Sequence, residues 1–461
     1  MVKPAIEVRK YEVNETALPP YELRPLVGER TGIVQRLYES YLERDDPEIS
    51  TYTIMQPHFE RMFDTEFELE FRAGAAGLSM RDAMMRVFGE IAERYSTCFY
   101  YEDELRLATY AELEREGVEA IGPDKLPLFS ETQFRRRAEY KIRGEEFFEP
   151  FTKDTKVSWV EGISLTTQNP VLVPAQCVYS GYGFLEGEVP ITYNTSNGCA
   201  ASLSYEGALL NAIYEVIERD AVMITWYSGL SPPRLDIGGC SMLHDLRSAR
   251  LERGTIEYVP FYITLDIDIP IVLCLMVDRG GRDPVVMTGG ACRLSPQDAA
   301  FKALLEAGQG RSYVKFLKIV MPDVSTINPH EIIDLEENLR FYSVPENFKK
   351  HMSFLFKSKD TVNIEEIEDK STGDLTRDLK TVIDLIDHHN LTAVAVDLTP
   401  DDIAQVGFRV VRVLIPELVY LSLPSAPFAG NRRLYEVPKK MGYRQEILTE
   451  EDLNPMPHPY P

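Results

Sequence analysis

Residues 204–226 read SYEGALLNAIYEVIERDAVMITW, a stretch that predicts one long, mostly apolar helix and so decides the fold. Within it, Glu215 and Glu218 are three residues apart and lie on one helix face, with Arg219 beside them. The surrounding positions are nearly all apolar, so we expect the helix to pack inside the protein and to bury both carboxylates in part. Buried carboxylates need a counter-charge or a metal ion.

The same pattern occurs earlier in the chain, because residues 90–94 read EIAER where residues 215–219 read EVIER. A single motif of this kind is most often an ion-paired, solvated helix face, but a second copy favours a functional role. Each copy also follows a predicted loop of small residues, 74–77 and 196–198, whose backbone can approach a phosphate group closely.

A third related helix is predicted after the glycine pair at 289–290. Ser295 is its expected N-cap, followed by proline at the first helical position and an acid at the third. This helix then carries Glu306, Gln309 and Arg311. We expect the three helices to converge on one site, where carboxylates would coordinate Mg²⁺ and arginines would neutralise phosphate oxygens.

The composition limits the class of protein. The chain has 461 residues, of which 44% are hydrophobic and 26% charged, as in a globular protein with a full core. Its formal net charge of -24 makes binding to nucleic acid or to an anionic membrane unfavourable. The six cysteines lack metal-ligand spacing, which indicates reduced thiols. The sequence has no recognisable secretion signal or membrane-spanning run, so we expect a cytoplasmic protein.

The alternation of predicted strands and helices indicates an α/β (α+β) protein. We expect three parts: an N-terminal docking or capping segment over 1–64, a core over 65–344, and a C-terminal subdomain over 345–461. The N-terminal segment includes a predicted helix over 31–44.

The remaining predicted elements are two hairpins in the core, and one helix and two strands in the C-terminal part. They cover residues 157–165 with 171–179, 271–277 with 285–290, the helix 375–389, and the strands 391–398 and 408–415. Prolines at alternate positions of the final NPMPHPYP forbid a helix and predict a stiff, extended tail.

These stretches carry a family resemblance. Residues 77–97, 196–226 and 298–311 resemble the three ATP-site segments of YcaO proteins, and with FRVVRVLIP the likeness covers roughly residues 65–461. The ending AGNRRLYEVP and its proline tail is similar to the azoline-forming branch of that family. The resemblance implies a YcaO-type fold, in which mixed and antiparallel sheets and helices surround a central ATP site.

The chemistry that the resemblance implies is ATP-dependent cyclodehydration of a ribosomally made precursor peptide, as in bacteriocin biosynthesis. A Cys, Ser or Thr side chain attacks the preceding amide, ATP phosphorylates the resulting oxyanion, and loss of phosphate leaves a thiazoline or oxazoline. Phosphorylation converts a very poor leaving group into a good one. Two alternatives stay open: a YcaO enzyme that forms thioamides or amidines, and a catalytically silent scaffold that docks the peptide.

The resemblance also assigns roles to residues of this chain. The expected metal ligands are Glu90, Glu93, Glu215 and Glu218. The expected ATP-binding residues are Arg94, Ser196, Arg219, Glu306, Gln309, Arg311 and Arg412. The expected catalytic tail residues are Pro457, Pro459 and Pro461, the last through its carboxylate.

Several positions depart from the family pattern. Many relatives have a lysine at Ala76, a serine at Arg86, Gly-Asn at Ser202 and Leu203, and a second acid at Gly207. Arg86 precedes Glu90 by one helical turn and is a candidate replacement for the missing cation.

The implied partners are the precursor peptide and a separate protein that binds its leader. A flavin-dependent azoline dehydrogenase and a second copy of the chain are further partners that the resemblance allows, whereas nucleic acid and membranes are not expected.

Overall fold

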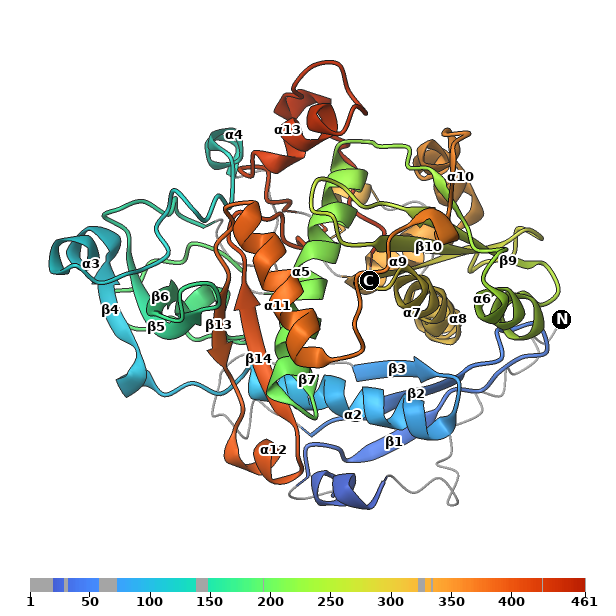
Figure 1. The fold of residues 1–461 in the computed structure, drawn as a ribbon, viewed down its shortest axis with the longest axis horizontal. Coiled ribbons are helices and arrows are strands. Elements are labelled where there is room, and N and C mark those ends of the chain that lie inside the picture. The colour runs from blue at the N-terminus through green and yellow to red at the C-terminus, as the bar shows by residue number, and fades with distance from the viewer. Residues whose placement is uncertain are drawn as a thin grey trace, which may run out of the picture.

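A computed structural model describes most of the chain as an α/β fold of three sheets with helices between them (Figure 1). Mixed and antiparallel sheets were expected, and that prediction is confirmed. The described residues are 20–28, 32–57, 73–137, 148–193, 195–321, 328–332, 335–424 and 426–460.

The smallest sheet is antiparallel and has the order β1 (Arg36–Glu39), β2 (Ser50–Met55), β3 (Ala73–Gly77). Two local predictions are wrong here. The helix expected over 31–44 is strand β1 and loops where it is described, because pairing with β2 overrides the local helical pattern. The small residues 74–77 belong to strand β3 rather than to a loop.

The second sheet has five strands in the order β11 (Val286–Cys292), β10 (Ile271–Asp278), β9 (Ile256–Tyr262), β8 (Arg234–Asp236), β12 (Thr361–Asn363). Only the β8–β12 pair is parallel among the described strands. The predicted hairpin of β10 and β11 is confirmed. Every residue of β10 is buried, since both faces of this sheet are covered.

The third sheet is antiparallel, with the order β4 (Arg106–Thr109), β5 (Lys156–Ser164), β13 (Val394–Asp397), β14 (Arg409–Leu414), β7 (Cys199–Ser202), and β6 (Pro170–Pro174) pairs with β5. The predicted β5–β6 hairpin is confirmed. Strands β13 and β14 come from the segment expected to form a C-terminal subdomain, yet they pair with β5 and β7 of the core. The boundary at residue 345 therefore separates elements that share sheets.

Three helices alternate with the three sheets: α2 (Met80–Ser96), α5 (Tyr205–Tyr227) and α7 (Pro296–Gln309). Helix α5 packs between the two large sheets, α2 between the third sheet and the small one, and α7 between the small and five-stranded sheets (Figure 1). Strand β3 consequently lies between α2 and α7, with Ala75 facing one helix and Ala76 the other. This close packing explains why its residues are small.

The chain has further described helices, of which α11 (Leu375–His388) packs against α5. None of the described helices is long and apolar enough to span a membrane. The remaining described α-helices are α3 (Tyr110–Glu116), α4 (Glu131–Arg135), α6 (Ser241–Leu246), α8 (Arg311–Val320), α9 (Leu335–Ser343), α10 (Pro345–His351), α12 (Asp401–Gln405) and α13 (Arg433–Lys440).

Candidate functional site

The three central helices begin in the same way. Each follows a strand and has a serine N-cap whose hydroxyl accepts a hydrogen bond from the backbone N–H three residues later. In each helix a glutamate follows this serine by eleven residues, about 16 Å further along the axis at 1.5 Å per residue. The three serine–glutamate pairs are Ser79 with Glu90, Ser204 with Glu215, and Ser295 with Glu306.

The first glutamate of each repeated motif is held by the small residues before its helix. The N–H of Gly74 donates to Glu90 Oε2 at 3.2 Å, and the N–H of Gly198 donates to Glu215 Oε1 at 3.3 Å. Gln309 of α7 donates to the Gly74 carbonyl. The backbone N–H and carbonyl of Gly74 therefore both contact expected site residues, Glu90 and Gln309. These contacts join α2, β3 and α7 at one point.

The carboxylates of the two motifs lie near one another. Burial raises the pKa of Glu93 well above its usual range, Arg94 lowers it, and repulsion from Glu215 and Glu90 raises it further. Burial likewise raises the pKa of Glu90 and of Glu215. The site still has access to solvent, since the side chains of Glu90 and Arg94 are 27% and 28% exposed and their ion pair spans 3.5 Å.

The second motif ends in a more deeply buried group. Glu218 is only 3% exposed, and its Oε1 accepts a 2.7 Å hydrogen bond from the hydroxyl of Tyr460. The Arg219 guanidinium lies 4.4 Å from the centre of the Tyr460 ring, and Arg219 Nε is 3.7 Å from Glu218 Oε1. Burial opposes the charge on Arg219, but Tyr460, Glu218, Glu215 and Glu306 together more than offset this effect and raise its pKa.

Arg219 has buried donors that suit an anionic ligand. In the described part of the chain, its buried Nε and Nη1 atoms have no hydrogen-bond partner. Buried guanidinium donors are almost always satisfied, and a phosphate oxygen is a suitable acceptor for them.

Arg412 and Ser196 position the segment before β7. Arg412 is buried on β14, and its Nη1 donates to the Thr195 carbonyl at 2.6 Å and to Cys199 Sγ at 3.2 Å. The Ser196 carbonyl accepts from the Cys199 N–H at 2.8 Å. Arg412 also lowers the pKa of Glu93, so its charge acts on the site.

Arg311 is placed elsewhere. It begins α8 after the break at Gly310, and its buried guanidinium pairs with Asp46 at 3.0 Å and Asp278 at 3.2 Å and donates to the Pro284 carbonyl. Its donors are therefore engaged away from the acids, and we leave Arg311 out of the proposed site. Glu306 does lie near the site, since its charge raises the pKa of Glu90, and it pairs with Lys302 at 3.3 Å.

The proline tail is extended and buried from Met456 to Tyr460, not solvated. The carbonyls of Pro457 and Pro459 accept hydrogen bonds from Tyr342 and Thr288, so these prolines hold the tail in place. Pro461 lies outside the described residues. The tail residue that contacts the acids is Tyr460, which the sequence patterns did not single out.

The donor set suits Mg²⁺ bound together with phosphate. No three acidic, histidine or cysteine side chains among the described residues are arranged so that they could hold a metal ion alone. Mg²⁺ commonly binds through one or two carboxylates, substrate phosphates and waters, and does not require a cage of protein ligands. Mutually repelling carboxylates fit that requirement, as do the Arg219 donors that have no hydrogen-bond partner among the described residues.

Comparisons with known proteins agree with this geometry. The sequence model of the YcaO cyclodehydratase family, described as binding ATP and Mg²⁺, matches residues 74–419. An uncharacterized protein of Methanothermobacter thermautotrophicus is 27% identical over 420 residues, which are 89% of this chain and 97% of that protein.

Two solved structures show the likeness of the fold. A heterocyclase in complex with substrate and cofactor has a TM-score of 0.76 and 22% identity, covering 95% of this chain and 57% of the heterocyclase chain. YcaO from Methanopyrus kandleri, bound with AMPPCP and Mg²⁺, has a TM-score of 0.59 and 21% identity, covering 86% of this chain and 88% of that one. The chain thus spans little more than half the length of the heterocyclase.

Proposed function

Since the chain belongs to the YcaO cyclodehydratase family, we propose that it is an ATP- and Mg²⁺-dependent cyclodehydratase acting on a ribosomally made peptide. The supporting observation is that one buried region gathers the acids and arginines of both repeated motifs with the C-terminal tail. A catalytically silent scaffold would have no use for mutually repelling buried carboxylates. The tail, typical of the azoline-forming branch, favours ring formation over thioamide or amidine formation.

In the proposed reaction, a Cys, Ser or Thr side chain of the substrate adds to the preceding amide carbonyl. The oxyanion takes the γ-phosphoryl group of ATP, releasing ADP, and loss of phosphate with the amide proton leaves the C=N bond of an azoline. The original carbonyl oxygen leaves in the phosphate, so each ring removes the mass of one water from the peptide. Bound Mg²⁺ supplies charge neutralisation at the phosphates.

This chain's own residues would bind and orient the reactants. We assign Mg²⁺ binding to Glu90, Glu93, Glu215 and Glu218. We assign binding of the ATP phosphates to Arg94 and Arg219. The unpaired donors of Arg219 point to a phosphate contact, and the burial of Glu218 keeps water from competing there. We assign Arg412, Ser196, Glu306 and Gln309 to holding the segments that surround the nucleotide.

Partners are part of the proposal. We propose that a separate protein binds the leader of the precursor peptide, as the resemblance to the azoline-forming branch implies. A net charge of -24 would favour approach of a cationic leader or partner. Because the reaction consumes ATP and uses free thiols, we place it in the cytoplasm.

The test is to incubate the purified chain with ATP, Mg²⁺ and the peptide encoded beside it, with and without the neighbouring partner, and to weigh the peptide. Loss of one water per ring supports the proposal. Exchange of oxygen for sulfur would replace it with thioamidation, and no ATP-dependent change with any partner would favour the scaffold.

A matched pair of variants ties the activity to the site. Glu215→Ala should abolish ATP consumption while the protein stays folded, whereas Glu131→Ala, which changes an exposed glutamate in the first turn of α4, should not change it. Unchanged turnover in Glu215→Ala would remove that residue from the site.

A further inference from the structure

The end of the chain is bound like a peptide ligand. Four successive tail carbonyls each accept one side-chain hydrogen bond. Because proline has no N–H, these carbonyls are the main backbone groups through which the segment can form hydrogen bonds. The pairs are Met456 with Trp226 at 2.8 Å, Pro457 with Tyr342, His458 with Asn338, and Pro459 with Thr288 at 3.0 Å. This spacing fixes the register of the tail and so the position of Tyr460.

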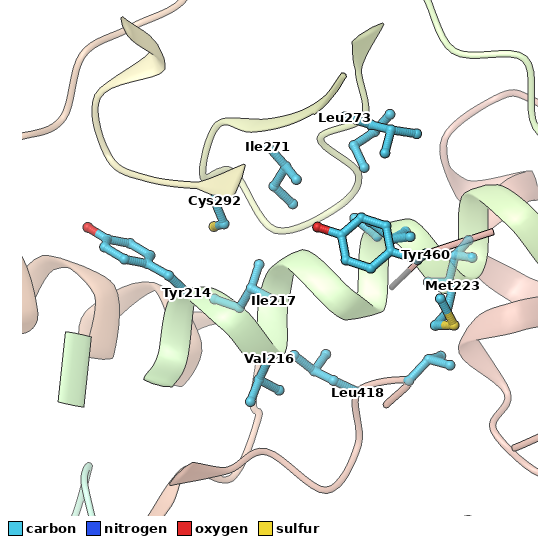
Figure 2. Close-up of a cluster of buried hydrophobic side chains, with 14 of the residues drawn as sticks. Tyr214, Val216, Ile217, Met223, Ile271, Leu273, Cys292, Leu418 and Tyr460 are labelled. Carbon is cyan, nitrogen blue, oxygen red and sulfur yellow. The ribbon is translucent and has the colours of Figure 1, made fainter. Parts of the chain in front are cut away.

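Tyr460 is seated in a matching space in the core. Its ring lies between α5 and the strand that carries Ile271 and Leu273 (Figure 2). A Cβ atom at position 290 would lie 2.3 Å from the Tyr460 hydroxyl, so the glycine there is needed for the tyrosine to reach Glu218.

The contacts of Tyr460 fall on two residues assigned to the nucleotide site. Its hydroxyl donates to Glu218 at 2.7 Å, and its ring lies 4.4 Å from the Arg219 guanidinium. Within the described chain, the Glu218 carboxylate accepts one hydrogen bond, which comes from this hydroxyl. Arg219 Nε lies 3.7 Å from the same carboxylate. One aromatic side chain therefore orients both an acid and a cation.

We propose that Tyr460 is a positioning residue of the nucleotide site, through which the seating of the tail sets the affinity for Mg²⁺–nucleotide. This inference rests on the proposed function and extends it, because the residue at issue is the tyrosine of the tail and not the prolines or the terminal carboxylate. It also implies the reverse effect: a bound nucleotide stabilises the seated tail, since coupling between two sites is reciprocal.

The test compares full-length variants by their affinity for Mg²⁺–AMPPCP, measured by calorimetry. Tyr460→Phe removes the hydroxyl but keeps the ring, and should raise the Kd about tenfold, as expected for a lost hydrogen bond to a charged group. Tyr460→Leu also removes the ring from Arg219 and should raise the Kd further. Tyr227→Phe is the matched control, because it too deletes a buried tyrosine hydroxyl, but within the described chain that hydroxyl pairs with Ser422 at 3.0 Å and not with a tail carbonyl, Glu218 or Arg219.

A loss of stability alone would affect Tyr460→Phe and Tyr227→Phe alike, so the inference requires the Kd to rise in the first and not in the second. The same Kd in both variants would overturn the inference. Hydrogen exchange of the C-terminal peptide of the wild-type protein provides a measurement that needs no variant: exchange should slow when Mg²⁺–AMPPCP binds, and an unchanged rate would also count against the coupling. A wild-type protein that does not bind Mg²⁺–AMPPCP would instead refute the proposed ATP site.

Discussion

Gly198 offers a quantitative test of how the second motif is held. Its φ is +84°, in the region that favours glycine, and a Cβ atom there would lie 2.3 Å from the Val413 carbonyl oxygen and 2.8 Å from Val216 Cγ2. The left-handed conformation costs alanine about 1–2 kcal/mol, and overpacking adds about 1–3 kcal/mol. We therefore expect Gly198→Ala to lower the free energy of unfolding by about 2–5 kcal/mol.

Gly187 is the matched control, because its φ is +85° but no atom lies within 4 Å of the Cβ position. Gly187→Ala should lose only the conformational part, about 1–2 kcal/mol, in urea denaturation followed by circular dichroism. Gly198→Ala should also weaken Mg²⁺–AMPPCP binding, since the displaced N–H is the donor to Glu215. Equal losses of stability in the two variants would show that the close approach to β14 does not constrain this turn.

Two further variants test the charges. Glu93→Gln should be more stable than the wild type near pH 8 but bind Mg²⁺–nucleotide less tightly. Because the folded-state pKa of Glu93 is raised, its charge destabilises the fold at high pH, and the difference in stability should vanish as the pH falls toward about 4.3 in urea titrations. Arg311→Met should cost about 1.5–3 kcal/mol by removing charge-assisted hydrogen bonds, since Asp46 keeps Lys315 and Asp278 keeps Arg282. The nucleotide Kd should be unchanged in calorimetry, and a large rise in Kd would return Arg311 to the site.

The sequence predicted the parts of the fold that depend on local patterns. The two hairpins and helix α11 have strong periodicity and turn signals, and they lie where expected. Strand β3 could not be predicted in this way, because AGAAG has little strand propensity and is a strand only through its pairing with β2 between two helices.

The candidate site divides along the same line. The repeated Glu-x-x-Glu-Arg motif and the serine caps are short-range signals, and the equal serine-to-glutamate spacing in all three helices would have related Glu306 to Glu90 and Glu215 directly. The partner of Arg311 is Asp46, far away in the sequence, and Tyr460 reaches Glu218 across a separation of 242 residues. Contacts of this kind depend on the assembled sheets, which local patterns do not specify.

The departures from the family pattern have local explanations in this structure. A Cβ atom at Gly207 would lie 2.6 Å from Ser202 Oγ and 2.9 Å from Ser204 Oγ, so the N-cap of α5 leaves little room for a second acid. Arg86 pairs with Asp82 at 3.0 Å, with both side chains about 40% exposed, and so it is already engaged at the surface.

The changes at Ala76, Leu203 and Gly207 lie near the starts of α2 and α5, whereas the first glutamate of each motif lies some three turns further along the same helix; Arg86, by contrast, lies one turn before Glu90. A helix rises about 1.5 Å per residue, so the N-caps and the acids are about 16 Å apart, roughly the span of an extended nucleotide triphosphate. The altered positions would then contact a part of the ligand remote from the metal. Under the proposed function, the departures near the helix starts would change how one end of the nucleotide is held, while the acids and arginines proposed for phosphoryl transfer are present in this chain.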